Sequence, residues 1–209
     1  MANLNAPFGL RLVGRVGGST HTARINRYAV ASGDNVALFI GDAVSTPGTN
    51  AFVTINTTGE ILPVVTQATV GAGSSDGTAI RGVVVGIDPI DGVAVGSENL
   101  NRLYRPASTQ MVVMVCDDPM ALFEIMYAGT FAGTLEGNAM NISATPVGST
   151  ATGISGMTAD TAFTASSTKA QLKLAGTQVK NTPNNSIGLY SVLQVMINYH
   201  ELASGTGGF

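Results

Sequence analysis

The sequence predicts an all-β protein: a β-sandwich or jelly-roll-like barrel with an extended N-terminal arm and a Gly/Ser/Thr-rich insertion. Two observations support this class. Apolar and polar residues alternate with a period of two far more often than with the helical period of about 3.6, and clusters of Gly, Pro, Asp and Asn interrupt the alternation at short intervals. No segment shows three clean turns of amphipathic helix. We therefore expect short strands joined by turns.

The first expected strands are short apolar runs at Tyr28–Val30 and Val36–Ile40. An alternating segment, Phe52–Asn56, is followed by a turn and a returning segment, Glu60–Val65, which together predict a hairpin. Pro63 has no backbone N–H to donate to a neighbouring strand, so we expect the second strand of this hairpin at a sheet edge.

Further strands are expected downstream at Ala79–Ile87, Gln110–Cys116, Ala121–Tyr127 and Gln171–Leu174. The last and longest, Leu189–His200, places Leu193, Val195 and Ile197 on one face and mixed residues on the other. This pattern is typical of a central sandwich strand with one face in the core. Asn99–Arg105 could form a short helical turn.

The composition favours an assembly subunit over a free catalyst. Only 11% of the 209 residues are charged, whereas about 25% is usual in soluble proteins, and 44% are hydrophobic. We expect much of this weakly charged surface to be covered by other subunits. The length allows one domain with a substantial core, or two small ones. We divide the chain into an arm at residues 1–27 and a β domain at residues 28–209.

The arm is basic, because four arginines precede the first acidic residue, Asp34. With one aromatic anchor they form the candidate partner-binding set: Phe8, Arg11, Arg15, Arg24 and Arg27. Such an arm suits docking on an acidic partner surface, and a solvated loop is the open alternative.

Within the β domain, residues 129–167 are dominated by Gly, Ala, Ser, Thr, Asn and Met. Glu136 and Asp160 are their only charged residues, and alternation is weak. We expect an insertion, or an arm that a neighbouring subunit orders.

Signals of reaction chemistry are weak. Asp117 and Asp118 could ligate Ca²⁺ or Mg²⁺, but adjacent strand residues point to opposite faces, which favours turn formation by their side chains. The single cysteine, Cys116, lies in an apolar run remote in sequence from His21 and His200 and is expected to be a buried, inert thiol. The loop Gly71–Asp76 lacks the third glycine of a dinucleotide fingerprint, and no helix follows it.

We therefore predict no enzyme activity, no catalytic residue, no cofactor and no metal site. The net charge of −3 argues against a large phosphate-binding face, and no run of about 20 apolar residues occurs. Neither nucleic acid nor a membrane is expected as a direct partner.

Several motifs resemble those of a group of structural proteins, roughly 200 residues long, from tailed bacteriophages. They are Asn5–Arg11, Arg27-Tyr28 with Ala31–Gly33, Leu38–Asp42, Arg81–Gly86, Cys116–Pro119 with Phe123-Glu124, Asn184-Asn185 with Gly188, and Val195–His200. The resemblance implies a head decoration, or cement, protein that binds the outer face of an expanded capsid and stabilises it.

The resemblance also implies the partners: the major capsid protein and further copies of this chain in a homotrimer, on a virion whose subunits are made in the host cytoplasm. Two other functions stay open. One is a tail, neck or head-fibre component, and the other is a host-glycan-binding β-sandwich. The latter usually exposes aromatic residues over a groove, whereas this chain has no Trp and five Tyr.

Overall fold

The computed structural model describes residues 3–17, 23–48, 52–56, 58–71, 77–91, 102–133, 138–143, 147–164, 169–175 and 185–203. These parts of the chain contain thirteen strands and no helix, and all paired strands run antiparallel in three sheets, so the predicted all-β class is confirmed. In order they are β1 (Arg11–Arg15), β2 (Ile25–Val30), β3 (Ala43–Ser45), β4 (Phe52–Thr54), β5 (Ile61–Pro63), β6 (Thr66–Gln67), β7 (Gly82–Asp91), β8 (Met111–Cys116), β9 (Ala121–Met126), β10 (Ala139–Ser143), β11 (Thr158–Thr164), β12 (Leu172–Leu174) and β13 (Val192–Ile197).

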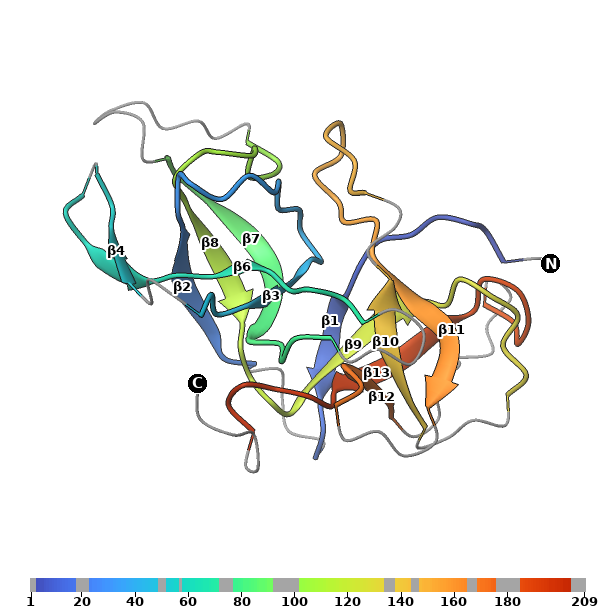
Figure 1. The fold of residues 1–209 in the computed structure, drawn as a ribbon. Coiled ribbons are helices and arrows are strands. Elements are labelled where there is room, and N and C mark those ends of the chain that lie inside the picture. The colour runs from blue at the N-terminus through green and yellow to red at the C-terminus, as the bar shows by residue number, and fades with distance from the viewer. Residues whose placement is uncertain are drawn as a thin grey trace.

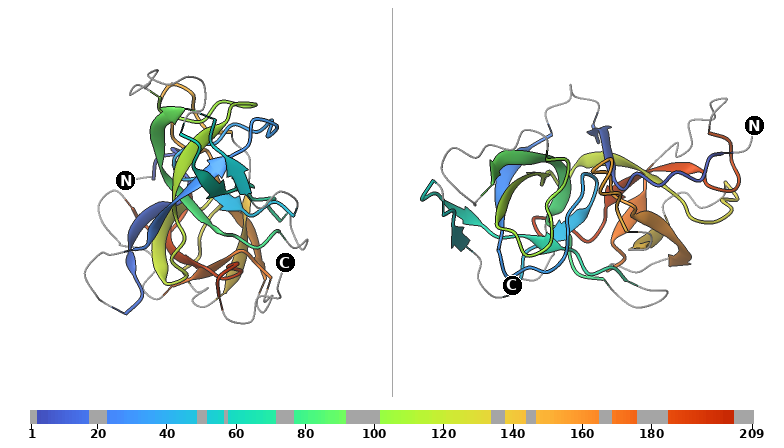
Figure 2. Two further views of the ribbon diagram at one scale, coloured as in Figure 1. Left: turned by 90° about the vertical axis from the view of Figure 1, so that its left-hand side faces the viewer. Right: turned by 90° about the horizontal axis from the view of Figure 1, so that it is seen from above.

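The first large sheet has the strand order β2-β8-β7-β3-β6 and lies on the left in Figure 1. Its two ends approach each other, because Ala29 on β2 forms a bridge with Val64 and accepts a 2.9 Å hydrogen bond from Val65. The right-hand view of Figure 2 shows the resulting curl of the sheet. Its interior is filled by Tyr28, Val30, Leu38, Val44, Val65, Val84, Val113 and Val115.

The second large sheet has the order β1-β9-β13-β12-β10-β11. It also curls, because Ala159 on β11 forms a bridge with Tyr127 at the end of β9 and accepts a 3.2 Å hydrogen bond from Ala128. On β13, Leu193, Val195 and Ile197 are buried and the alternate residues are half-buried, so the predicted facing of this strand is confirmed.

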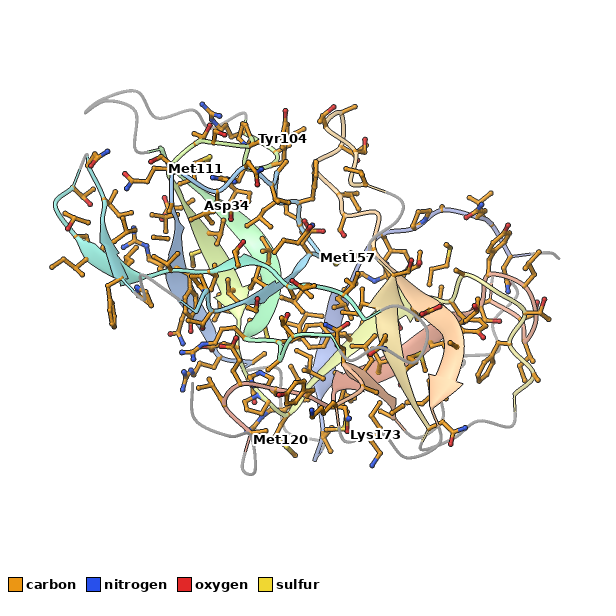
Figure 3. The ribbon with its side chains drawn as sticks, in the orientation of Figure 1. Asp34, Tyr104, Met111, Met120, Met157 and Lys173 are labelled. Carbon is orange, nitrogen blue, oxygen red and sulfur yellow. The ribbon has the colours of Figure 1, made fainter. Side chains whose placement is uncertain are left out.

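One hydrophobic cluster joins the two sheets. Val83 and Cys116 from the first sheet belong to the same buried cluster as Phe123 and Ile142 from the second, together with Leu10. Met157 belongs to this cluster and lies between the sheets in Figure 3. Burial across the junction therefore holds the two sheets together.

The predicted hairpin is present as β4 and β5, with Phe52 opposite Pro63. It projects from one end of the molecule (Figure 1) and forms a separate two-stranded sheet, which agrees with an edge position for Pro63. Val53 and Leu62 pack towards β2 and β8, whereas the side chains of Phe52 and Ile61 are 66% and 67% exposed.

Part of the segment that the sequence predicts to be an insertion belongs instead to the main core. The segment 129–167 supplies β10 and β11, and Met140, Ile142 and Ala159 are fully buried. Four of the five β10 residues are buried, so both faces of this strand are covered and the sequence shows no polar alternation.

The expected N-terminal arm also differs from the structure. Arg11–Arg15 form the outer strand of the second sheet, with a bulge between Leu12 and Gly14, and the boundary expected after residue 27 falls inside β2. A five-residue strand that contains a glycine and has arginines at both ends carries little β signal.

Arg105 organises the loops where a strand at Val36–Ile40 and a helical turn were expected. Its fully buried guanidinium donates hydrogen bonds to the backbone oxygens of Ala31, Asp34, Val36 and Thr109. Residues 36–40 make only isolated bridges, through Leu38 and Ile40, and residues 102–105 are not helical. Residues 99–101 and the loop 72–76 lie outside the described residues.

Candidate interaction surface

The N-terminal segment lies on its own chain. The side-chain amide of Asn3 donates 2.8 Å hydrogen bonds to the backbone oxygens of Ser186 and Leu189, and its Oδ1 accepts a 2.9 Å bond from the Ser186 N–H. These bonds fix the start of the described chain on the loop before β13.

Gly9 brings the same segment into close contact with two other loops. It has a φ of +68°, and a Cβ at this position would lie 2.5 Å from the Gly41 oxygen and from the Ser155 Cβ. Leu10 then donates a 2.9 Å backbone hydrogen bond to Gly41. Only glycine satisfies both the backbone conformation and the close approach.

Phe8, next to this contact, lies between two adjoining hollows. One, of about 380 Å³, lies between the two sheets and is lined by Leu12, Ile40, Val85 and Ile154 among others. The other, of about 470 Å³, is lined by residues 6–8 and by the loop 147–156. Phe8, Arg11 and Ile154 line both hollows, so we treat them as one surface and call it the Phe8 groove.

Arg11 forms the polar rim of the Phe8 groove. Its guanidinium carbon lies 4.9 Å from the centroid of the Phe8 ring, and its Nη2 pairs with Glu124 on β9. The side chain of Arg11 is nevertheless 62% exposed, against 15% for Glu124. The ring and the carboxylate thus hold a guanidinium that still faces solvent.

Exposed apolar side chains extend the groove. Ile40 and Ile154 form a backbone bridge and are 38% and 41% exposed, and Val147 is 78% exposed. Leu103, 47% exposed, packs against Gly153 beside Ile154. A continuous apolar surface beside a fixed cation has the anatomy of a protein interface, in which an apolar centre is surrounded by polar groups.

The three other predicted arginines also pair with carboxylates of their own chain. Arg15 lies 2.9 Å from Asp118, and Arg24 makes two bonds, of 3.0 and 3.1 Å, to Asp117. Arg27 contacts Glu60 at 2.7 Å and Asp88 at 3.1 Å. The structure therefore separates the predicted set: Phe8 and Arg11 meet in the groove, Arg15 and Arg24 pair with the acids that follow β8, and Arg27 lies within β2.

Asp117 is the centre of a buried hydrogen-bond network that sequence reasoning missed. Its side chain is fully buried and accepts bonds from Arg24, from Asn26 at 2.9 and 3.0 Å, and from the Tyr28 hydroxyl at 2.6 Å. Burial alone would raise the pKa of Asp117, but the hydrogen bonds from Arg24, Tyr28 and Asn26 outweigh it and hold that pKa below its usual value. The carboxylate is therefore ionised and structural.

Asp118 instead closes the turn between β8 and β9, because its Oδ1 accepts a 2.9 Å bond from the Met120 N–H. The expected turn formation by the Asp pair thus holds for Asp118 and not for Asp117. Among the described residues, no group of three or more His, Cys, Asp or Glu side chains is placed to hold a metal ion.

Two other buried titratable groups have strongly shifted pKa values. Burial raises the pKa of Cys116 to about 11, so the thiol is protonated at neutral pH, in agreement with the predicted inert cysteine. Burial lowers the pKa of His200 to about 4, so this imidazole is neutral, and its Nδ1 accepts a 3.0 Å bond from the Leu202 N–H.

Comparison with known proteins finds no family model, no curated protein and no solved structure that matches this chain. The described residues also include no helix long and apolar enough to cross a bilayer.

Sequence reasoning missed the groove residues Ile40 and Ile154 and the Tyr28–Asp117 network because their members come from distant segments. The one available signal lies in the motifs, because Gly9, Gly41, Tyr28 and Asp117 each belong to a motif of the resemblance. Nothing in the sequence indicated that they meet.

Proposed function

We propose that this protein is a capsid decoration protein, which binds the outer face of a phage head and stabilises the shell. The observation that carries the proposal is the Phe8 groove: an exposed apolar surface with a fixed guanidinium, on a chain of which only 11% is charged. Such a surface is costly to leave in water and is suited to burial against another protein.

The resemblance to phage structural proteins is the reason for proposing a phage head as the assembly that this protein joins. Its motif residues are also contacts of this fold: Gly9 meets Gly41, Arg11 pairs with Glu124, and Tyr28 bonds Asp117. Gly9, Gly41, Arg11 and Glu124 position the groove, whereas Tyr28 and Asp117 hold the first sheet. The motif residues therefore make structural contacts between distant segments of this chain.

The proposed mechanism requires a large buried interface and many copies of the protein on each shell, and it requires no catalytic turnover. A stable protein interface buries about 1,200–2,000 Å² in total, and many copies on one lattice make the opening of the shell cost many such contacts at once. The proposed partners are the major capsid protein and, in a homotrimer, other copies of this chain. Closed cyclic symmetry covers apolar surface without producing open filaments, and the number three comes from the resemblance.

Binding to purified expanded shells tests the proposal. We expect saturable binding that Ile154→Asp weakens at least about tenfold, since a charge placed in an apolar interface must be desolvated. Met120→Asp is the matched control, because Met120 is 40% exposed, close to the 41% of Ile154, and lies at the lower edge of Figure 3. Absence of binding, or a copy number of dozens or fewer per virion in place of hundreds, would favour a tail, neck or head-fibre component.

A further inference from the structure

A separate hollow of about 640 Å³ lies on β2, outside the Phe8 groove. Three arginines line it, Arg24, Arg27 and Arg81, and no acidic residue is among the described residues of its lining. Leu62, Pro63 and Met114 form an apolar wall. The pocket therefore presents cationic donors beside apolar surface.

Two of the guanidinium groups are held in place by one hydrogen-bond chain. Arg81 donates from Nε to the Tyr28 hydroxyl at 2.9 Å, and its guanidinium carbon lies 5.4 Å from the centroid of that ring. The same hydroxyl donates to Asp117, which also accepts both bonds from Arg24. A ligand that binds both arginines would therefore find them already ordered, which reduces the entropy lost on binding.

The acidic partners lie behind these arginines. The side chain of Asp117 is fully buried, and that of Glu201 is 2% exposed and lies 3.8 Å from Arg81 Nη1. Both Glu201 oxygens accept hydrogen bonds from Thr46, at 2.7 and 2.6 Å. The bonds to Asp117 use Nε and Nη2 of Arg24, a side chain that is 60% exposed, so its Nη1 is left as a donor at the surface.

Arg27 is different, because its Nη1 bonds both oxygens of Glu60 and its Nε bonds Asp88. Two carboxylates therefore neutralise it. The part of the pocket that can take an additional anion is the part between Arg24 and Arg81.

We propose that this pocket binds a carboxylate side chain of a partner protein, held between Arg24 and Arg81. Guanidinium groups bind carboxylates through paired, charge-assisted hydrogen bonds. The apolar wall suits the methylene groups of a Glu or Asp side chain. The buried carboxylates of Asp117 and Glu201 balance the formal charge of Arg24 and Arg81, which favours a singly charged group held by hydrogen bonds over a phosphate dianion. The inference is independent of the virion role, because the pocket and the Phe8 groove share no residue.

The test uses the full chain, isotope-labelled with ¹⁵N, and follows the arginine Nε–Hε signals by NMR. The probe is a capped hexaglutamate peptide, added up to about 10 mM. We expect saturable shifts at Arg24 and Arg81 and none at Arg105, whose side chain is fully buried. Arg81→Gln should weaken binding about tenfold, and Arg81→Lys should restore it only in part because lysine lacks the planar fork. Lys173→Gln, at an exposed position of β12, should leave binding unchanged.

The wild-type shifts test the proposal even if a variant does not fold. Absence of saturable shifts at Arg24 and Arg81, or equal affinity in the Arg81→Gln variant, would overturn it. A parallel titration with sodium phosphate tests whether the pocket binds a phosphate group in place of a carboxylate. Saturable binding of phosphate without binding of the peptide would overturn the carboxylate assignment.

Discussion

The Tyr28 hydroxyl donates a 2.6 Å hydrogen bond to the fully buried carboxylate of Asp117, 89 residues further along the chain. The bond links β2 to the segment that follows β8, and the same carboxylate fixes Arg24 and Asn26. Asp117 therefore ties the first sheet to the turn through which the chain enters the second.

Asp117→Ala should destabilise the fold by about 2–5 kcal/mol, because it leaves the Tyr28 hydroxyl, the Arg24 guanidinium and the Asn26 amide without their acceptor. Urea unfolding measures the change. Glu60→Ala is the control: Glu60 is 39% exposed and its partner Arg27 keeps Asp88, so the expected loss is below about 1 kcal/mol. Equal losses in both variants would contradict the structural role of Asp117.

Stability should fall as the pH is lowered from about 6.5 to about 4, because the unfolded chain protonates His200 in this range while the folded chain keeps it neutral. The expected loss is roughly 3 kcal/mol in total for a shift of this size. Urea midpoints at several pH values measure it, and His200→Gln should flatten the curve in this range. The lowered pKa of Asp117 adds a further loss only as the pH falls below about 4, through the folded pKa. Parallel curves for wild type and His200→Gln would show that His200 is not buried as described.

Gly9→Ala should cost about 1–3 kcal/mol, because the positive φ disfavours alanine and its Cβ would clash with Gly41 and Ser155. For a chain of this length that corresponds to a melting temperature lower by roughly 2–12 °C. Gly33→Ala is the matched control, since a Cβ at Gly33 meets no atom within 4 Å. An unchanged melting temperature for Gly9→Ala would mean that residues 3–10 do not lie on the sheets.

Val195→Asp should prevent soluble folding, because Val195 is fully buried on β13 and an unpaired carboxylate there costs several kcal/mol against a typical stability of about 5–15 kcal/mol. Gln194→Asp, on the half-buried face, should remain soluble with a small loss, since Gln194 lies opposite Glu124. Solubility and circular dichroism distinguish the two variants. Similar behaviour of both would reject the facing of this strand.

Alternation predicted strands in which only one face is buried, and the continuous apolar run at β8 predicted a strand that is buried at nearly every position. The β4–β5 hairpin and β13 alternate clearly because their outer residues are partly exposed, and both were located from this pattern. β10 has a buried residue at nearly every position, and β1 is short, bulged and flanked by arginines, so neither shows the period of a half-buried strand.

The candidate site was predictable only in part. Phe8 and Arg11 were identified from an aromatic residue and a basic run, and both line the groove. Ile40 and Ile154 became neighbours through a bridge across 114 positions, and Arg81 reaches Tyr28 because β2 and β7 both pair with β8. Register between distant strands is set by packing of the whole core, which one sequence does not display.

A cryo-EM map of the intact virion, with this chain fitted into it, is the decisive test of the capsid-decoration role. We expect density for the chain on the outer face of the head, in trimers at the local three-fold positions, with the Phe8 groove covered by the shell protein or by a neighbouring copy. Density for this chain only at the tail or neck, or a Phe8 groove facing solvent in every copy, would contradict it.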